Sequence, residues 1–206
     1  MSNLTDKWLN ILDALQALHW SEAGAVLFGV LYLVYAIREH PICWFLGIIS
    51  CALWAYAAFV LLNLYVDALL QLFYIGMSIW GIYHWRRGGA KKLPVTTMTF
   101  REHIVLITVG LALSWAVGYW FDRYTAAAAT YLDAFTTVFS ILTTVLVVQK
   151  KLENWLYWLV IDVVYVYLYW SRGGYLFTLL FLLYLVLAID GFRQWRRSYR
   201  QERIST

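Results

Sequence analysis

The sequence has few charged residues, two prolines and two cysteines. Asp, Glu, Lys and Arg make up 14% of its 206 residues, little more than half the usual share of a soluble domain, while 63% are hydrophobic. One soluble core of this size cannot enclose so much apolar surface, so most of the chain must face lipid. Cys43 and Cys51 lie about 12 Å apart along one predicted helix, which is too far for a disulfide.

Motifs of several membrane functions are also missing. A retinal protein needs a lysine in its last helix, and no lysine lies inside a long apolar run. No nucleophile with its base, no carboxylate pair and no histidine cluster lies within such a run, so no catalytic residue, metal ligand or cofactor is predicted. The absence of a Gly-rich phosphate loop argues against ATP-driven transport, and no filter or ring of charge indicates a channel.

Seven apolar stretches are long enough, or nearly so, to cross about 30 Å of hydrocarbon at about 1.5 Å per residue. They are residues 23–37, 42–62, 64–85, 103–121, 130–149, 155–170 and 175–195. Residues 7–20 precede them and carry apolar side chains at helical spacing, namely Trp8, Ile11, Leu12, Leu15 and Leu18. This spacing predicts an amphipathic helix on the outer membrane interface.

The basic residues predict the orientation of the chain. One set of loops holds thirteen of the 16 Lys and Arg residues, and the other holds only Lys7, Arg123 and Arg172. The thirteen are Arg38, Arg86, Arg87, Lys91, Lys92, Arg101, Lys150, Lys151, Arg193, Arg196, Arg197, Arg200 and Arg203. By the positive-inside rule the C-terminus is cytoplasmic and the N-terminus outside. The excess of basic charge is therefore a topology signal, and no nucleic-acid partner is predicted.

The third and seventh stretches are copies of each other. Residues 65–87 and 175–197 are 110 positions apart and share ten of 23 residues, including the ending Gly-x-x-x-Trp-Arg-Arg. Both copies must leave the bilayer on the same side, so the repeat is parallel, as in one class of transporters. A fourth crossing between two triplets restores the chain direction, which predicts a 3+1+3 arrangement.

The predicted parts are an interfacial helix at 1–22 and a first three-helix bundle at 23–87. A linker with the fourth crossing follows at 88–128, and a second bundle with a basic tail at 129–206. Gly88, Gly89 and Pro94 mark the linker. A weaker similarity places Trp44 opposite Trp158, 114 positions apart.

Polar side chains recur on one face of three predicted helices. The three rows are Trp155, Trp158, Asp162, Val166 and Tyr169; Asp67, Gln71, Tyr74 and Ser78; and Asp133, Thr136, Thr137, Ser140 and Thr144. Because unpartnered polar groups cost a few kcal/mol each in hydrocarbon, such rows indicate a water-accessible chamber or interhelical hydrogen bonds. Close helix packing is the alternative for the Ser/Thr row, and solvation at a membrane mouth is the alternative for Asp67 and Asp133.

Asp162 and Gln71 lie well inside their helices. A carboxylate at such a depth in the membrane usually marks a functional site. Two indoles near a carboxylate suit a planar, cationic, polyhydroxylated or heteroaromatic molecule. The segment Glu153-Asn154-Trp155-Leu156-Tyr157-Trp158-Leu159-Val160-Ile161-Asp162 resembles the Trp-x-x-Trp-x-x-x-Asn/Asp motif of the PnuC vitamin transporters. The segments 65–71 and 81–85 resemble the same family.

This resemblance implies an all-α membrane protein with seven transmembrane helices in a SWEET-like fold, located in the bacterial inner membrane. It implies facilitated diffusion of nicotinamide riboside, trapped inside the cell by a kinase that need not touch the carrier. Trp155 and Trp158 would frame the ring, Asp162 would hydrogen-bond the ligand, and Gln71 would reach it from the other half. Further expected contacts are Tyr74, Trp44, Asn154, Thr137 and Ser140. Thiamine or riboflavin is the alternative substrate, and a homo-oligomer remains open.

Overall fold

The structure, a computed structural model, describes residues 4–61, 65–87, 93–124 and 130–204. Every regular element in these ranges is a helix, and the one β-contact among them is an isolated bridge between Thr96 and Lys151. The chain divides into two units, Met1–Leu93 and Pro94–Thr206. The predicted limits at 88 and 128 lie outside the described residues, as do Gly88, Gly89, Lys91 and Lys92 of the predicted linker.

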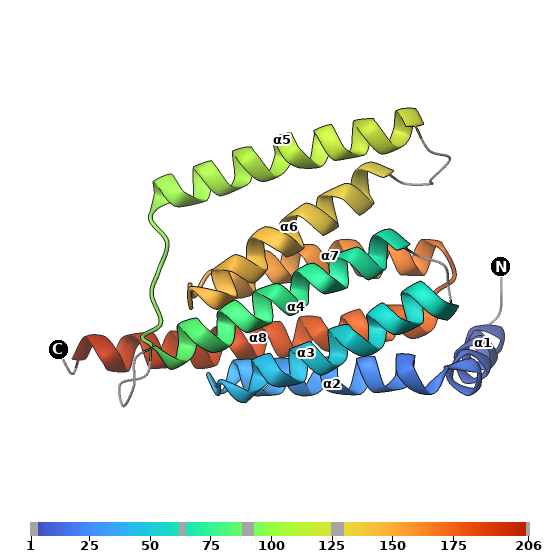
Figure 1. The fold of residues 1–206 in the computed structure, drawn as a ribbon, viewed down its shortest axis with the longest axis horizontal. Helices are drawn as coiled ribbons and strands as arrows, with labels where there is room; N and C mark the ends of the chain where they lie inside the picture. Colours follow the sequence, from blue (N-terminus) through green and yellow to red (C-terminus); the bar gives the residue numbers. More distant parts are fainter. Residues whose placement is uncertain (1–3, 62–64, 88–92, 125–129, 205–206) are drawn as a thin grey trace. The chain divides into compact units, whose positions relative to one another are not determined.

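The first unit contains four α-helices and one π-helical segment among its described residues. They are α1 (Leu4–Ala17), α2 (Trp20–Ile37), α3 (Ile42–Tyr56), η1 (Ala57–Leu61) and α4 (Tyr65–Arg86) (Figure 1). Helix α3 lies between α2 and α4 and packs against both. The core of the first unit includes Trp44 of α3 and Trp85 of α4.

Helix α1 is shorter at its C-terminal end than the predicted helix at 7–20. It ends at Ala17, because His19 begins a new helix as the N-cap of α2. The backbone N–H of Ser21 donates to the His19 ring, and the His19 N–H donates to the Glu22 carboxylate at 2.9 Å, an arrangement equivalent to a capping box. Leu18 and Trp20 therefore lie outside α1.

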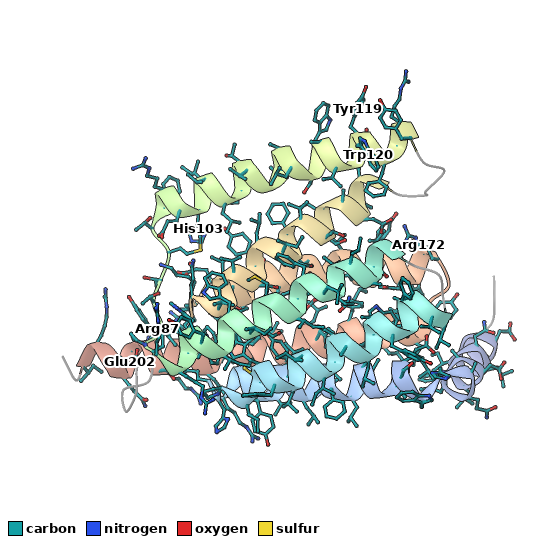
Figure 2. All side chains as sticks on the ribbon, in the orientation of Figure 1. Arg87, His103, Tyr119, Trp120, Arg172 and Glu202 are labelled. Atoms are coloured by element: carbon teal, nitrogen blue, oxygen red, sulfur yellow. The ribbon has the colours of Figure 1, made fainter. Side chains whose placement is uncertain are left out.

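The second unit contains α5 (Phe100–Tyr124), α6 (Thr130–Val148), α7 (Asn154–Ser171) and α8 (Tyr175–Ile204). Within this unit α5 packs on α6, α6 on α7, and α7 on α8. Helices α6, α7 and α8 thus repeat the neighbour relations of α2, α3 and α4. Figure 2 shows Arg172 where α7 ends, and Tyr119 and Trp120 near the end of α5.

The predicted common ending of the two repeat copies is wrong for the second copy. Helix α4 ends at Arg86, whereas α8 continues through Trp195, Arg196 and Arg197 to Ile204. The extension is held by its own contacts, since the Glu202 carboxylate accepts the Val95 N–H at 3.2 Å. The Gly-x-x-x-Trp-Arg-Arg sequence therefore ends a helix in the first copy and lies inside a helix in the second.

Five described helices are long and apolar enough to cross a membrane. They are Trp20–Ile37, Ile42–Leu61, Phe100–Tyr124, Tyr131–Val148 and Tyr175–Ile204. The other two predicted crossings are also helical, as α4 with 22 residues and α7 with 18. They carry Gln71 and Asp162, respectively. These are the helices that carry the two central candidate residues.

Candidate functional site

The two units contain the same backbone turn in front of their middle helices. Glu39 after α2 and Lys150 after α6 have positive φ angles, 54° and 52°. The N–H of His40 donates to the Tyr35 carbonyl, and the N–H of Lys151 donates to the Leu146 carbonyl, as expected for a Schellman ending. Glu39 and Lys150 are 111 positions apart, so this turn fixes the correspondence between the halves.

Each turn is followed by the same tryptophan packing. Trp44 and Trp155 are both 1% exposed and lie edge-on against Trp85 and Trp195, with ring centroids 5.3 and 5.4 Å apart. Trp44 therefore corresponds to Trp155, at a spacing of 111, and the predicted pairing of Trp44 with Trp158 is wrong. Residue types alone suggested a spacing of 114, because the sequence does not show the turn that sets the register.

A glycine makes room for each buried indole. A Cβ added at Gly191 would lie 2.6 Å from the ring of Trp155, and a Cβ added at Gly81 would overlap the ring of Trp44. Contacts this short do not occur between real side chains, so only glycine permits the helices to approach so closely. We call these two clusters the tryptophan locks: Trp44, Gly81 and Trp85 in the first unit, and Trp155, Gly191 and Trp195 in the second.

The second unit contains a buried carboxylate, Asp162, on the same helix as Trp155 of its lock. Asp162 lies two turns after Trp155 on α7 and is 3% exposed within the structure. Trp158 lies between them in the sequence and is half-buried. The Asp162 carboxylate is thus buried within the protein rather than turned toward lipid.

Hydroxyl groups of α6 lie at about the same depth as Asp162. The turn between the helices reverses the chain, and Ser140 lies as far before Gln149 as Asp162 lies after Glu153. Thr136 and Thr144 donate their hydroxyls to carbonyls of their own helix, at 3.0 and 2.8 Å. The buried hydroxyl oxygens of Ser140 and Thr143 have no hydrogen-bond partner.

Two more polar atoms without partners lie at the start of α7. The Nε1 of Trp155 and the Oδ1 of Asn154 are buried and unpartnered, while the Asn154 amide nitrogen donates to the Lys151 carbonyl at 2.6 Å. Such atoms are unusual in protein interiors and call for a ligand or water. Among the described side chains, four such atoms with unused hydrogen-bonding capacity therefore lie in the second unit and one, Trp44 Nε1, in the first.

Sequence reasoning missed Thr143, which continues the α6 face at a spacing of three from Ser140. It could have been found by following that face to the next turn. Thr137, which was predicted, is half-buried. Asp133 lies at the exposed end of α6, where its carboxylate accepts a hydrogen bond from Arg172 at 2.8 Å. This position fits the alternative interpretation of Asp133 as a solvated residue.

The first unit places its candidate residues on α4. Gln71 and Tyr74 are half-buried, and Ser78 is buried close to α3. A Cβ added at Gly47 would lie 3.2 Å from the Ser78 hydroxyl and 3.2 Å from the Tyr32 ring. Ser78 therefore packs against α3, whereas Asp67, Gln71 and Tyr74 have partly accessible side chains.

The halves differ in how they fill the space next to the locks. At the spacing set by the turns, Gly47 corresponds to Trp158 and Tyr32 corresponds to Thr143. The ring of Tyr32 lies against Gly47 and 5.8 Å from Trp44. A large side chain on α2 thus meets a glycine on α3, whereas α6 has a small residue where α7 has an indole. The sequence alone did not show this exchange.

No cluster of three or more His, Cys, Asp or Glu residues gathers within the described ranges. The buried polar groups described in the second unit include the Asp162 carboxylate, the hydroxyls of Ser140 and Thr143, the Asn154 amide and the Trp155 indole. Such groups recognise an organic ligand through hydrogen bonds, with the indole face available for a flat ring.

Comparison with known proteins identifies the family. Residues 19–197 match the family described as nicotinamide mononucleotide transporter. The chain belongs to this family. It is accordingly a multi-pass membrane protein of a transporter family, which agrees with its apolar helices.

Relatives of this family resemble the chain over most of its length. The nicotinamide riboside transporter PnuC of Escherichia coli K12 is 26% identical over 211 residues, covering 89% of this chain and 88% of the relative. The riboflavin/roseoflavin transporter RibM of Streptomyces davaonensis is 27% identical over 207 residues, covering 95% of each. A crystal structure of the vitamin B3 transporter PnuC matches with a TM-score of 0.74, 21% identity and coverage of 96% and 88%. The chain therefore shares its fold.

Proposed function

We propose that this chain carries nicotinamide riboside across the bacterial inner membrane. The observation that carries the proposal is the enclosed carboxylate of Asp162, in a unit with four unpartnered buried polar atoms. Nicotinamide riboside has a flat cationic ring and a polyhydroxylated sugar, so it needs both an anion and hydrogen-bonding groups. The PnuC relative of Escherichia coli supports the same substrate.

Each candidate residue receives a proposed role. Trp158, which is half-buried, stacks on the ring, and Asp162 offsets its charge. The Trp155 N–H, the Asn154 carbonyl oxygen and the Ser140 hydroxyl offer hydrogen bonds that nothing else uses. Thr137 of the second unit and Gln71, Tyr74 and Trp44 of the first are proposed as additional ligand contacts.

The proposed architecture is seven transmembrane helices in a SWEET-like 3+1+3 arrangement. Its support is the internal repeat, because α2–α4 and α6–α8 contain the same turn and the same tryptophan lock. The bias of basic residues supports a cytoplasmic C-terminus and an external N-terminus. Transport is proposed to be passive, followed by phosphorylation of the vitamin by an intracellular kinase. No enzymatic step is assigned to the carrier.

Uptake into proteoliposomes tests the transport proposal. Vesicles with the purified full-length chain should equilibrate labelled nicotinamide riboside without any ion gradient, and empty vesicles should not. The Trp158→Ala variant should lose most of this uptake while remaining folded, because the ring loses its stacking partner. Uptake that requires a proton or sodium gradient would contradict the passive mechanism, and absence of uptake under all conditions would contradict the substrate.

Riboflavin is a second candidate substrate, because the RibM relative matches 95% of the chain at a similar identity. Thiamine is a third, since it is also a flat cation. Competition experiments with the same vesicles separate the three. An excess of unlabelled nicotinamide riboside should abolish uptake of the label. Stronger competition by riboflavin or thiamine would reassign the substrate and leave the carrier function intact.

A further inference from the structure

The second unit contains a groove that the transport proposal does not use. It lies between α5 and α6, has a volume of about 520 Å³ and is lined mainly by apolar side chains, including Val105, Val109 and Leu142. This volume lies within the range of ligand-binding pockets, about 300–1,000 Å³. Both walls belong to helices able to cross a membrane.

The groove exists because α5 contacts α6 closely at one end only. A Cβ added at Gly110 would lie 2.6 Å from Phe139, and one added at Gly118 would lie 2.6 Å from Tyr131. These glycines bring α5 close to α6 from Gly110 onward, whereas the part of α5 before Gly110 carries larger residues. In Figure 1 the ribbons of α5 and α6 accordingly draw apart toward the start of α5.

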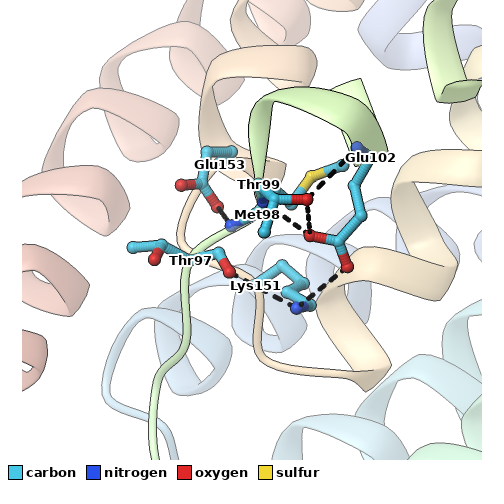
Figure 3. A network of polar contacts seen from close by, with 6 residues as sticks. All are labelled: Thr97, Met98, Thr99, Glu102, Lys151 and Glu153. Carbon is cyan, nitrogen blue, oxygen red and sulfur yellow. Dashed lines mark hydrogen bonds and ion pairs between the residues drawn. The ribbon is translucent and has the colours of Figure 1, made fainter. Parts of the chain in front are cut away.

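The strap before α5, residues 93–99, holds the helix in this position. The N–H of Thr96 donates to the Lys150 carbonyl at 3.0 Å. The N–H of Met98 donates to the Glu153 carboxylate at 3.0 Å (Figure 3). The start of α5 is thus tied to the turn between α6 and α7 rather than to the side of α6. The opening is built into the fold.

Cationic groups lie at one end of the groove. Arg101 and Lys151 both line it, and Arg101 is exposed. Lys151 contacts the Thr97 carbonyl at 3.4 Å and the Glu102 carboxylate at 3.5 Å, both long distances (Figure 3). Glu102 also caps α5, since its carboxylate accepts from the N–H and the hydroxyl of Thr99. Two cations, Arg101 and Lys151, thus stand against the single carboxylate of Glu102 in the groove lining, which leaves a net positive charge at the groove end.

We propose that this groove binds a phospholipid with an anionic headgroup. The phosphate is held by Arg101 and Lys151, and one acyl chain lies along Val105 and Val109. Val109 lies about 12 Å from Arg101 along α5 at the standard helical rise, so the apolar stretch between them suits a hydrocarbon chain. Basic pockets between membrane helices on the basic side bind such headgroups. The proposal does not depend on which vitamin is carried.

Native mass spectrometry of the purified full-length chain tests this site, with phosphatidylglycerol and phosphatidylcholine as probes. Arg101→Gln and Lys151→Gln should each weaken phosphatidylglycerol binding about fivefold, and together about 25-fold, without affecting phosphatidylcholine. The matched control is Arg193→Gln with Arg196→Gln, which removes two exposed arginines of α8 outside the groove. The control should bind phosphatidylglycerol like the unaltered chain. An equal loss in the control, or no loss in the double groove variant, would overturn the site.

A second variant tests the apolar part. Val109→Trp places an indole in the groove and should weaken both lipids roughly tenfold, which corresponds to about two methylene groups withdrawn from contact. Val109 is exposed, so the folded state should tolerate the change. If the variant changed the oligomeric state and left lipid binding intact, the groove would be an interface between copies of this chain and the lipid proposal would fall.

Discussion

The two halves of this chain have the same tryptophan lock but opposite side chains beside it. In the first, Tyr32 fills the space at Gly47; in the second, Thr143 is small and Trp158 is large. The carboxylate of Asp162 has no counterpart either, because the corresponding residue is Cys51. The shared lock packs the helices of each unit together, and the residues that differ beside it include Trp158 and Asp162, which are proposed to contact the ligand.

The strongest test of this difference is to place an indole in the first half. Gly47→Trp should lower the free energy of unfolding by at least about 3 kcal/mol, because the ring of Tyr32 occupies the space. Adding Tyr32→Thr, which reproduces the pair of the second half, should recover much of that loss. Thermal unfolding in detergent measures both.

A second variant serves as the control for backbone effects. Gly47→Ala adds only a methyl group at 3.2 Å from its neighbours and should cost far less than Gly47→Trp. If Gly47→Trp unfolded at the same temperature as the unaltered chain, the exchange of large and small residues would have no packing basis.

The locks should respond alike to substitution. Gly81→Ala and Gly191→Ala should each cost about 1–3 kcal/mol of unfolding free energy, since the new methyl group meets a buried indole. Gly76→Ala is the matched control on α4, because a Cβ there has nothing within 4 Å. That control should be neutral or stabilising by up to about 1 kcal/mol through its helix propensity. A cost in one half only would show that the locks are not equivalent.

The smallest expected effect concerns a contact that occurs in the second half alone. Arg172 donates a hydrogen bond to Asp133, and this bond raises the pKa of Arg172 above its usual value. Both side chains are more than two-fifths exposed, so the pair should contribute about 0.2–1 kcal/mol. Asp133→Asn should therefore shift the unfolding temperature slightly, and less so at high salt. A larger effect would give Asp133 a role beyond a surface ion pair.

The sequence predicted those features that repeat as residue identities. The copies at 65–87 and 175–197 were accessible in this way, and the apolar composition of the seven stretches indicated that they are helical. The pairing of Trp44 with Trp155 was not, because the first half has one residue more between its two lock tryptophans. The π-helical segment Ala57–Leu61 lies within that interval and can accommodate such a residue.

The remaining features depend on side chains that share no identity. The residue types of Tyr32 and Gly47 do not show that the two are in contact. They also do not show that Thr143 corresponds to Tyr32 and Trp158 to Gly47. The continuation of α8 beyond Trp195 also depends on a distant contact, from Val95 to Glu202. Such contacts join residues far apart in the sequence, so periodicity cannot reveal them.

Binding calorimetry on Asp162→Asn tests most directly whether the second half binds a cation through its carboxylate. We expect the affinity for nicotinamide riboside to fall at least about tenfold, or roughly 1.4 kcal/mol, because the asparagine keeps the shape but not the charge. Cys51→Ala, at the corresponding position of the first half, should bind like the unaltered chain. Wild-type affinity in Asp162→Asn, or an equal loss in Cys51→Ala, would contradict the account.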